Sequence, residues 1–223
     1  MFINKYLFLH SKIRKIKGIN KFTLKNNQIE GLKSNYYFFL ILKFINFTAN
    51  SNIPKTNAMI EQSNIKLELG GKTYKTVKIN NEFWMAENLN FPIEGSYFYD
   101  NDLNNGEKHG RLYTWDAAMK ACPKGWHLPS DKEWDEMLDT LGGPEEAYSK
   151  IMFDGEAGLK LDFSGYKTVH GDFLSLDRAG DFWTSTDAGD LNAWLRYVIH
   201  KKENVFKIID DKRCGFSVRY VKD

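Results

Sequence analysis

The segment from Gly110 to Pro144 constrains the fold of this chain more than any other part of it. Its first half, around Trp115, has the pattern of a short helix followed by a tight turn and an extended stretch. Ser130 and Glu133 then form the pattern of a capping box, in which each side chain bonds the backbone N–H of the other residue. Large apolar residues follow at positions i, i+3, i+4 and i+7: Trp134, Met137, Leu138 and Leu141. This spacing predicts a second helix with one buried face, ended by Gly142-Gly143-Pro144.

Strands are predicted before and after these helices. Tyr74, Val77 and Ile79 alternate imperfectly with lysines, and a turn at Asn80-Asn81 then leads into Phe83–Met85, which indicates a hairpin. Four later segments have the pattern of closing antiparallel strands: 182–186, 193–200, 204–209 and 215–221. Residues 101–109 are predicted to form a polar loop, and residues 155–171 a long irregular region. The expected fold class is α+β, with two helices against an antiparallel sheet and the N- and C-terminal strands paired.

The charge of the chain is unevenly divided. Residues 1–58 contain ten Lys or Arg residues against one acid, Glu30, which gives +9; because the whole chain carries +2, the remainder carries −7. An acidic domain is a poor binder of nucleic acid, since contacts to phosphates need clustered Lys and Arg. We therefore expect a basic leader over residues 1–64, a folded domain over residues 65–223, and no nucleic-acid partner.

The leader contains an apolar stretch, Tyr36–Leu42, that is too short to cross a bilayer, which takes ~20 residues. Its length suits the apolar part of a signal peptide, Lys33 supplies a positive flank, and Thr56–Ala58 has a small-residue cleavage pattern. Roughly thirty residues precede the apolar stretch, which is long for a signal peptide. The alternative is a disordered or mistranslated leader. We expect a secreted or cell-surface protein without a transmembrane helix.

Several of these motifs resemble the Fibrobacter succinogenes major paralogous domain family, in the same order and with similar spacing from about Gly70 to Asp223. They are Thr73–Ile79, Trp84–Leu89, the Trp115 helix, Gly125–Ser130, Phe182–Thr186 and Gly215–Arg219. The resemblance implies a C-type-lectin-like fold, with two helices on antiparallel sheets and long irregular loops. That superfold also includes the formylglycine-generating domains that activate sulfatases. The resemblance further implies a surface or secreted bacterial domain of largely unknown activity.

Cys122 and Cys214 are the only cysteines of the chain. An even number in an exported protein suggests a disulfide. In the similar family the second cysteine follows the Arg of the Gly-Phe-Ser-Val-Arg motif, where this chain has Tyr220. Cys214 lies six residues earlier, about 20 Å along a strand, whereas the Cα atoms of a disulfide lie within about 7 Å. We expect two unpaired thiols, with a bridge of shifted geometry as the alternative.

The cysteines and histidines of this chain do not form a recognisable catalytic pattern. The formylglycine-generating enzymes use paired cysteines near the C-terminal strand to bind copper and the substrate thiol, and only Cys214 lies in that region. Lys212 and Arg213 beside it would lower its thiol pKa. The chain also lacks a Ser-His-Asp order, a metal-spaced His pair and a Gly-rich phosphate loop. His127 is expected to form structural hydrogen bonds. We therefore expect no catalytic residues and no cofactor other than calcium.

Calcium-dependent lectins hold the metal with a Glu-Pro-Asn or Gln-Pro-Asp loop and a Trp-Asn-Asp strand, and this chain has neither motif. Asp187, Asp190 and Asn192 supply oxygen atoms at positions i, i+3 and i+5. Oxygen ligands are what Ca²⁺ prefers. These three residues are the metal-site candidates, but a solvated acidic loop is the favoured interpretation of this segment.

Aromatic residues give the second set of site candidates. Five of the six Trp residues are expected in the core, because they occupy family motifs or alternate along strands. Tyr97, Phe98 and Tyr99 lie next to the predicted polar loop and are the better candidates for an exposed ligand-binding patch. The expected function is non-catalytic binding of a glycan or a protein. The alternative is a structural or assembly subunit of a surface complex, and a formylglycine-generating-type oxidase is a third interpretation.

Overall fold

The computed structural model of the protein describes residues 60–223 and, within the first strand, side chains from Ser63 onward. These residues belong to a compact unit that spans Thr56–Asp223. The apolar stretch Tyr36–Leu42 and the cleavage pattern at Thr56–Ala58 lie outside the described residues, as does most of the expected leader. No helix among residues 60–223 has the length and apolar character needed to cross a membrane.

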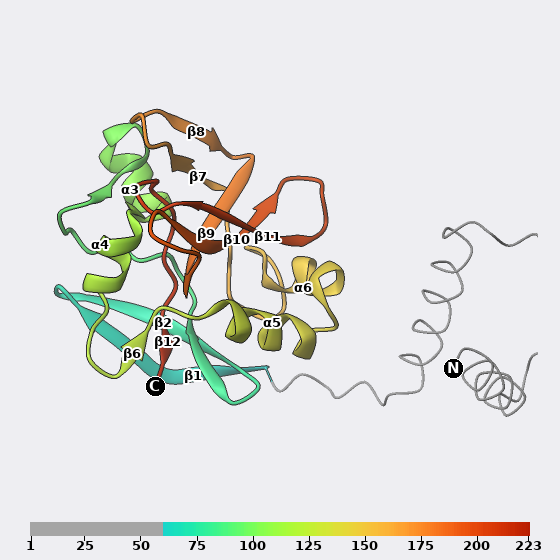
Figure 1. Ribbon diagram of the computed structural model, residues 1–223. Helices are drawn as coiled ribbons and strands as arrows, with labels where there is room; N and C mark the ends of the chain where they lie inside the picture. The colour runs from blue at the N-terminus through green and yellow to red at the C-terminus, as the bar shows by residue number, and fades with distance from the viewer. Residues whose placement is uncertain (1–59) are drawn as a thin grey trace, which may run out of the picture. The chain divides into compact units, whose positions relative to one another are not determined.

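One five-stranded antiparallel sheet contains both the first and the last strand of the domain (Figure 1). Its order is β1 (Ile60–Leu69), β2 (Lys72–Ile79), β3 (Glu82–Met85), β12 (Val221–Lys222) and β6 (Trp126–His127). The predicted β2–β3 hairpin is present, with Val77 opposite Trp84. Strand β1 begins at residue 60, before the expected domain start at residue 65. The C-terminal strand pairs with β3 and β6 rather than with the first strand.

The second sheet has the order β11 (Val205–Asp211), β10 (Asn192–Ile199), β9 (Ala179–Asp187), β7 (Ser164–Lys167) and β8 (Phe173–Leu176). A short ribbon of β4 (Ser96–Tyr97) and β5 (Leu112–Tyr113) stands apart from both sheets. The closing strands at 182–186, 193–200 and 204–209 are confirmed within β9, β10 and β11. The expectation for 215–221 is wrong for most of its length, since this segment makes isolated bridges to neighbouring segments and only Val221 belongs to a strand.

The described residues form four α-helices rather than two: α3 (Leu103–His109), α4 (Trp115–Lys120), α5 (Asp131–Thr140) and α6 (Pro144–Ile151). The expectation of a loop at residues 101–109 is wrong. Asp102 caps α3 by accepting from the Asn104 N–H, and Gly106 packs so closely that a Cβ there would lie 2.0 Å from the Phe98 ring. Two buried positions in seven residues give α3 too little apolar periodicity to be recognised from the sequence.

Helix α5 matches its prediction. The Ser130 Oγ accepts from the Glu133 N–H at 3.2 Å, and the Glu133 carboxylate accepts from the Ser130 N–H at 2.7 Å. The predicted face is buried: Trp134, Met137, Leu138 and Leu141 are each at most 3% exposed. Pro144 both follows the end of α5 and occupies the first turn of α6, a position that needs no N–H donor.

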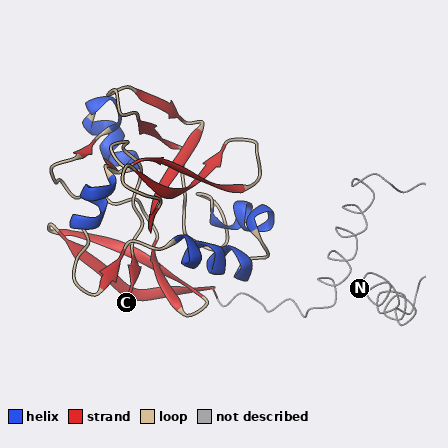
Figure 2. Ribbon diagram, in the orientation of Figure 1, coloured by secondary structure: helices blue, strands red, loops and turns tan. Residues whose placement is uncertain are grey.

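The main core lies where α5 and α6 pack between the two sheets (Figure 1). Trp84 of β3 meets Trp134 of α5 edge-on, with ring centroids 5.2 Å apart. A second cluster joins α4 to the opposite end of both sheets, around Trp183 and Phe216. Figure 2 shows the helices in two groups: α5 and α6, which belong to the main core, and α3 and α4, of which α4 belongs to the second cluster. The fold is mixed, with more strand than helix and two antiparallel-rich sheets.

The tryptophans only partly match the expectation that five of them lie in the core. Trp84, Trp134 and Trp183 have no solvent exposure. The other three are half-buried: Trp115, Trp126 and Trp194. Trp115 packs against the second cluster, and the polar edge of its ring donates the N–H to the Thr184 carbonyl.

We expect Trp134→Ala to lower the free energy of unfolding by ~3–5 kcal/mol, because it empties the centre of the main core. Ser130→Ala removes one cap and should lower it by ~1 kcal/mol. Denaturant unfolding of both variants measures the difference. Equal and mild effects would contradict the position of α5 between the sheets.

Candidate functional site

Arg219, one of two buried arginines among residues 60–223, organises the region between the two sheets. Arg219, 1% exposed, lies just before β12 and donates to four acceptors. Its Nε bonds the Asn88 Oδ1 at 2.7 Å, and its guanidinium nitrogens reach the carbonyls of Met85, Leu159 and Lys160. Burial lowers the pKa of Arg219 to about 10, so the group stays charged at neutral pH. The charge is therefore solvated by backbone and amide oxygens instead of water.

Asn88 connects this arginine to a histidine–aspartate pair. Its Nδ2 donates to the His109 carbonyl at 2.8 Å and to the Asp162 Oδ1 at 3.0 Å. The second oxygen of Asp162 lies 2.8 Å from the His109 Nδ1. A carboxylate only accepts hydrogen bonds, so Nδ1 carries a proton, and Nε2 is the other nitrogen of the ring. This Nε2 is buried and has no hydrogen-bond partner among the described residues.

His109 and Asp162 line a cavity of about 740 Å³. The cavity lies between the end of α3, the end of α6 and the turns that contain Asp177 and His200. Phe153 is 64% exposed at this cavity, and Phe163 stacks on His200 with ring centroids 5.3 Å apart. The cavity thus combines aromatic surfaces with fixed polar groups, as small-molecule sites commonly do.

The His109–Asp162 pair has no nucleophile to activate in this arrangement. No hydroxyl or thiol of the described residues bonds the free ring nitrogen. Ser149 also lines the cavity, but its hydroxyl donates to the Glu146 carbonyl. Within residues 60–223 no three His, Cys, Asp or Glu side chains are gathered so that they could hold a metal ion. What this geometry does provide is hydrogen-bonding and stacking for a bound ligand.

The predicted aromatic patch at Tyr97, Phe98 and Tyr99 is not an exposed platform. Tyr99 is 8% exposed, because the single 3-10 turn Tyr99–Asn101 points it inward against Phe173. Cations cover the other two rings: the Lys167 ammonium lies 4.4 Å from the Tyr97 ring centroid, and the Arg111 guanidinium 3.8 Å from that of Phe98. Ligand access to all three rings is thereby reduced.

The metal-site candidates share the β9–β10 hairpin, but a lysine already binds the first of them. Asp187 accepts from the Lys212 Nζ at 2.9 Å and from the Gly189 N–H at 2.9 Å. The hydrogen bond from Lys212 is the main reason that the pKa of Asp187 is lowered. Asp190 is exposed, and Asn192 pairs with Asp211 in the sheet. The Lys212 ammonium therefore already compensates the charge of the Asp187 carboxylate.

The two cysteines are free thiols in different surroundings. Cys122 is half-buried and donates to the Trp126 carbonyl at 3.0 Å, whereas Cys214 is buried beside Asp210. Burial raises the pKa of each thiol to about 12. The expectation that neighbouring positive charge lowers the pKa of Cys214 is therefore wrong, since Arg213 is paired with Asp211.

His127 forms the structural hydrogen bonds that were expected of it. Its Nδ1 lies 2.7 Å from an oxygen of Asp223, and its Nε2 lies 2.6 Å from the Glu133 Oε1. Partial burial lowers the pKa of His127, but the bonds to the two carboxylates outweigh it and leave the pKa above its ordinary value of 6.5. The ring therefore links β6 to the capping box of α5 and to the last residue.

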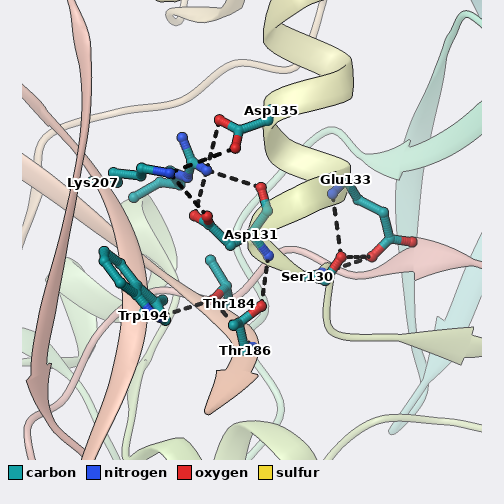
Figure 3. Close-up of polar contacts among 9 residues, drawn as sticks. Ser130, Asp131, Glu133, Asp135, Thr184, Thr186, Trp194 and Lys207 are labelled. Atoms are coloured by element: carbon teal, nitrogen blue, oxygen red, sulfur yellow. Dashed lines mark hydrogen bonds and ion pairs between the residues drawn. The ribbon is translucent and has the colours of Figure 1, made fainter. Parts of the chain in front are cut away.

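A second buried arginine attaches α5 to the other sheet. Arg196 of β10, 2% exposed, bonds the carboxylates of Asp131 and Asp135. Figure 3 shows both aspartates on α5 facing Lys207 of β11, whose Nζ lies 3.2 Å from Asp131. Alternation along a strand places residue 196 on one face with Trp194 and Val198, and this pattern does not indicate the ion pair. The i,i+4 spacing of the two acids on a predicted helix was the available signal.

No local pattern in the sequence indicates the His109–Asp162 pair. These residues are 53 positions apart, and His109 was assigned to a loop. The available signal is a polar residue within each of two apolar motifs: Asn88 in Trp84–Leu89 and Arg219 in Gly215–Arg219. Both motif residues are buried and bond to each other.

We expect Arg219→Met to lower the free energy of unfolding by about 3–5 kcal/mol, because several buried oxygens lose their donor. The control is Arg213→Met, which removes an exposed arginine paired with Asp211 and should cost much less, because water screens an exposed ion pair. Denaturant titrations at neutral pH compare them. Similar losses would show that the buried network adds no stability.

The raised pKa of His127 predicts a pH dependence of stability. The protonated ring is favoured in the folded state, so its contribution is complete below pH 6.5 and is lost as the pH rises through the folded-state pKa. The difference in unfolding free energy between wild type and His127→Gln should therefore shrink from mildly acidic to alkaline pH. A difference that is constant with pH would contradict the assigned contacts.

The family model of the Fibrobacter succinogenes major domain matches residues 77–222. Comparisons with curated proteins and with solved structures give no match. The matched segment contains the whole network from Asn88 to Arg219, together with His109, Asp162 and the rest of the cavity. Because the match covers well over half of the sequence, the chain belongs to the Fibrobacter succinogenes major domain family.

Proposed function

We propose that the protein is a non-catalytic binding module, secreted or at the cell surface, whose ligand site is the cavity beside His109. The observation that carries this proposal is the buried network that holds His109 and Asp162 at the cavity. Polar groups that are fixed before binding cost little entropy when a ligand arrives.

The cavity is better suited to a glycan than to a broad protein surface. Protein partners typically bury about 800 Å² on each side over a broad surface, whereas a cavity of about 740 Å³ has the size of a small-ligand site. Phe153 offers an exposed ring, and the carboxylates of the lining Asp residues offer acceptors for hydroxyl groups. A protein segment that inserts into the cavity is the alternative ligand.

The alternative function, an assembly subunit, is favoured by a different surface. Ile208 and Ile209 are 49% and 44% exposed on β11, which is the edge strand of the second sheet. Leu191, 63% exposed, lies in the hairpin before the neighbouring strand β10. Edge strands with exposed apolar residues are suited to pairing with another chain.

The oxidase interpretation has the least support. Copper binding and thiol chemistry require thiolates, and burial raises the pKa of both cysteines to about 12. The C-type-lectin-like assignment is part of our proposal as well. It is supported by two antiparallel-rich sheets, the long connections between them, and the first and last strands in one sheet.

The test is a glycan array probed with the full chain, with and without calcium, followed by titration of the best-bound glycan. We expect Phe153→Ala to weaken binding at least tenfold, because the exposed ring is lost from the cavity. Leu191→Ala is the matched control. Leu191 is 63% exposed, close to the 64% of Phe153, but it does not line the cavity. Equal binding by both variants would place the ligand elsewhere.

A further inference from the structure

Resting on the proposed glycan-binding role of this cavity, we propose that its ligand is a protonated amino sugar, whose ammonium group pairs with Asp154 while its ring lies against Phe153. Two features of the cavity carry this inference. One is the charge of its wall, and the other is the exposed aromatic surface next to that charge.

The cavity wall carries more negative than positive charge. Its acidic residues are Asp154, Asp162 and Asp177, and Lys108 is the only lysine or arginine among the described residues that line it. A ligand with a carboxylate would meet charges of its own sign, whereas an ammonium group would meet charges of the opposite sign. The wall therefore favours a cation over an acidic or an uncharged ligand.

Asp154 is the carboxylate that is available to such a cation. Asp162 already lies 2.8 Å from the His109 Nδ1, and Asp177 lies 3.8 Å from the Lys108 Nζ. Asp154 is exposed, and within residues 60–223 no hydrogen bond or ion pair engages its side chain. The uncompensated charge of the wall is thus concentrated on this one residue.

The aromatic side chains of the cavity supply a second attraction. Phe153, 64% exposed, directly precedes Asp154 in the turn after α6, and both line the cavity. The face of an aromatic ring attracts a cation, and it also packs against the apolar face of a sugar ring. Phe163 and His200 stack with ring centroids 5.3 Å apart and add another flat surface to the wall. A sugar that bears an ammonium group can use the carboxylate and the aromatic surface together.

One lysine outside the cavity competes for the Phe153 ring. The Lys160 Nζ lies 6.0 Å from the ring centroid, at the outer limit of a cation–π contact. Lys160 is exposed and does not line the cavity. A ligand ammonium at the ring gains the Asp154 carboxylate as well, a partner that Lys160 does not have.

A lysine side chain of a peptide is the competing source of an ammonium group. Its four-carbon stem loses rotamer freedom when it is held in one position, whereas the amine of an amino sugar is attached directly to a rigid ring. The sugar ring also presents a broad face to the aromatic surfaces, which a linear stem does not. We therefore assign the cavity to an amino sugar rather than to a basic peptide.

Three oligosaccharides with the same backbone provide the test, by isothermal titration calorimetry with the full chain. Cellohexaose, the N-acetylglucosamine hexamer and the glucosamine hexamer differ only in carrying a hydroxyl, an acetamide or an amine on each sugar. Titrations at about pH 6 keep the amine largely protonated and the aspartates ionised. We expect the glucosamine hexamer to bind at least about fivefold more tightly than either of the other two.

Two exposed acids of the same loop identify the group that binds the amine. Asp154→Asn removes the lining carboxylate and should weaken binding of the glucosamine hexamer at least about threefold. Glu156→Gln is the matched control, because it removes the same charge from an exposed residue that does not line the cavity. It should leave the affinity unchanged. Denaturant unfolding checks that both variants are as stable as the wild type.

The outcomes separate this inference from the proposed function. Equal binding of the three hexamers, or tighter binding of cellohexaose, would overturn the amino-sugar assignment and leave glycan binding intact. Equal effects of Asp154→Asn and Glu156→Gln would also overturn it, because the attraction would then belong to the acidic domain as a whole.

Hexalysine is the peptide probe, and tighter binding of hexalysine than of the glucosamine hexamer would assign the cavity to a basic peptide instead. If the glucosamine hexamer does not bind while the array shows other glycans bound, the amino-sugar inference alone fails. If the array is blank as well, the proposed function itself fails.

Discussion

The structure depends on how the positive charge of Arg219 is compensated inside the domain. Moving a guanidinium from water into a protein interior costs several kcal/mol unless its donors are satisfied. Here the acceptors come from Asn88, from the carbonyl of Met85 at the end of β3, and from the Leu159–Lys160 loop. Three segments far apart in the chain must therefore meet at one point. Lys160 adopts a positive φ of 54° at this point, an uncommon backbone conformation for a non-glycine residue.

The same compensation fixes the cavity. Asn88 uses its oxygen for Arg219 and its nitrogen for Asp162 and the His109 carbonyl, so both ends of the amide are determined. Asp162 then fixes the orientation of the His109 ring. A binding site supported in this way keeps its geometry without a ligand. The hydrogen bonds that stabilise the domain would thus also support the proposed binding site, so variants at the cavity rim test that proposal better than variants in the network.

Helix α5 is held by polar contacts at one end and by apolar packing along its length. Arg196 and Lys207 bind its aspartates from the second sheet, while His127 links its capping box to the first sheet. Between them, Trp134 packs against both Trp84 and Phe182. The helix therefore bridges the two sheets, and the cavity lies at the far end of the helix that follows it, α6.

The sequence by itself determined the elements whose signals are local. The capping box, the buried face of α5, the β2–β3 hairpin and three of the closing strands all depend on residues within a few positions of one another. Helix α3 was missed because a cap and a close glycine contact, rather than apolar periodicity, support it. Tyr99 was assigned to the surface because its burial comes from contact with Phe173, in a distant strand.

Only the tertiary structure decided the site. His109 contacts Asp162, 53 residues away in the sequence, and Asn88 contacts Arg219, 131 residues away. Such pairs leave no periodic pattern in the sequence, because the energy that selects them is the cost of leaving buried polar groups unpaired, and that cost exists only once the chain has folded around them.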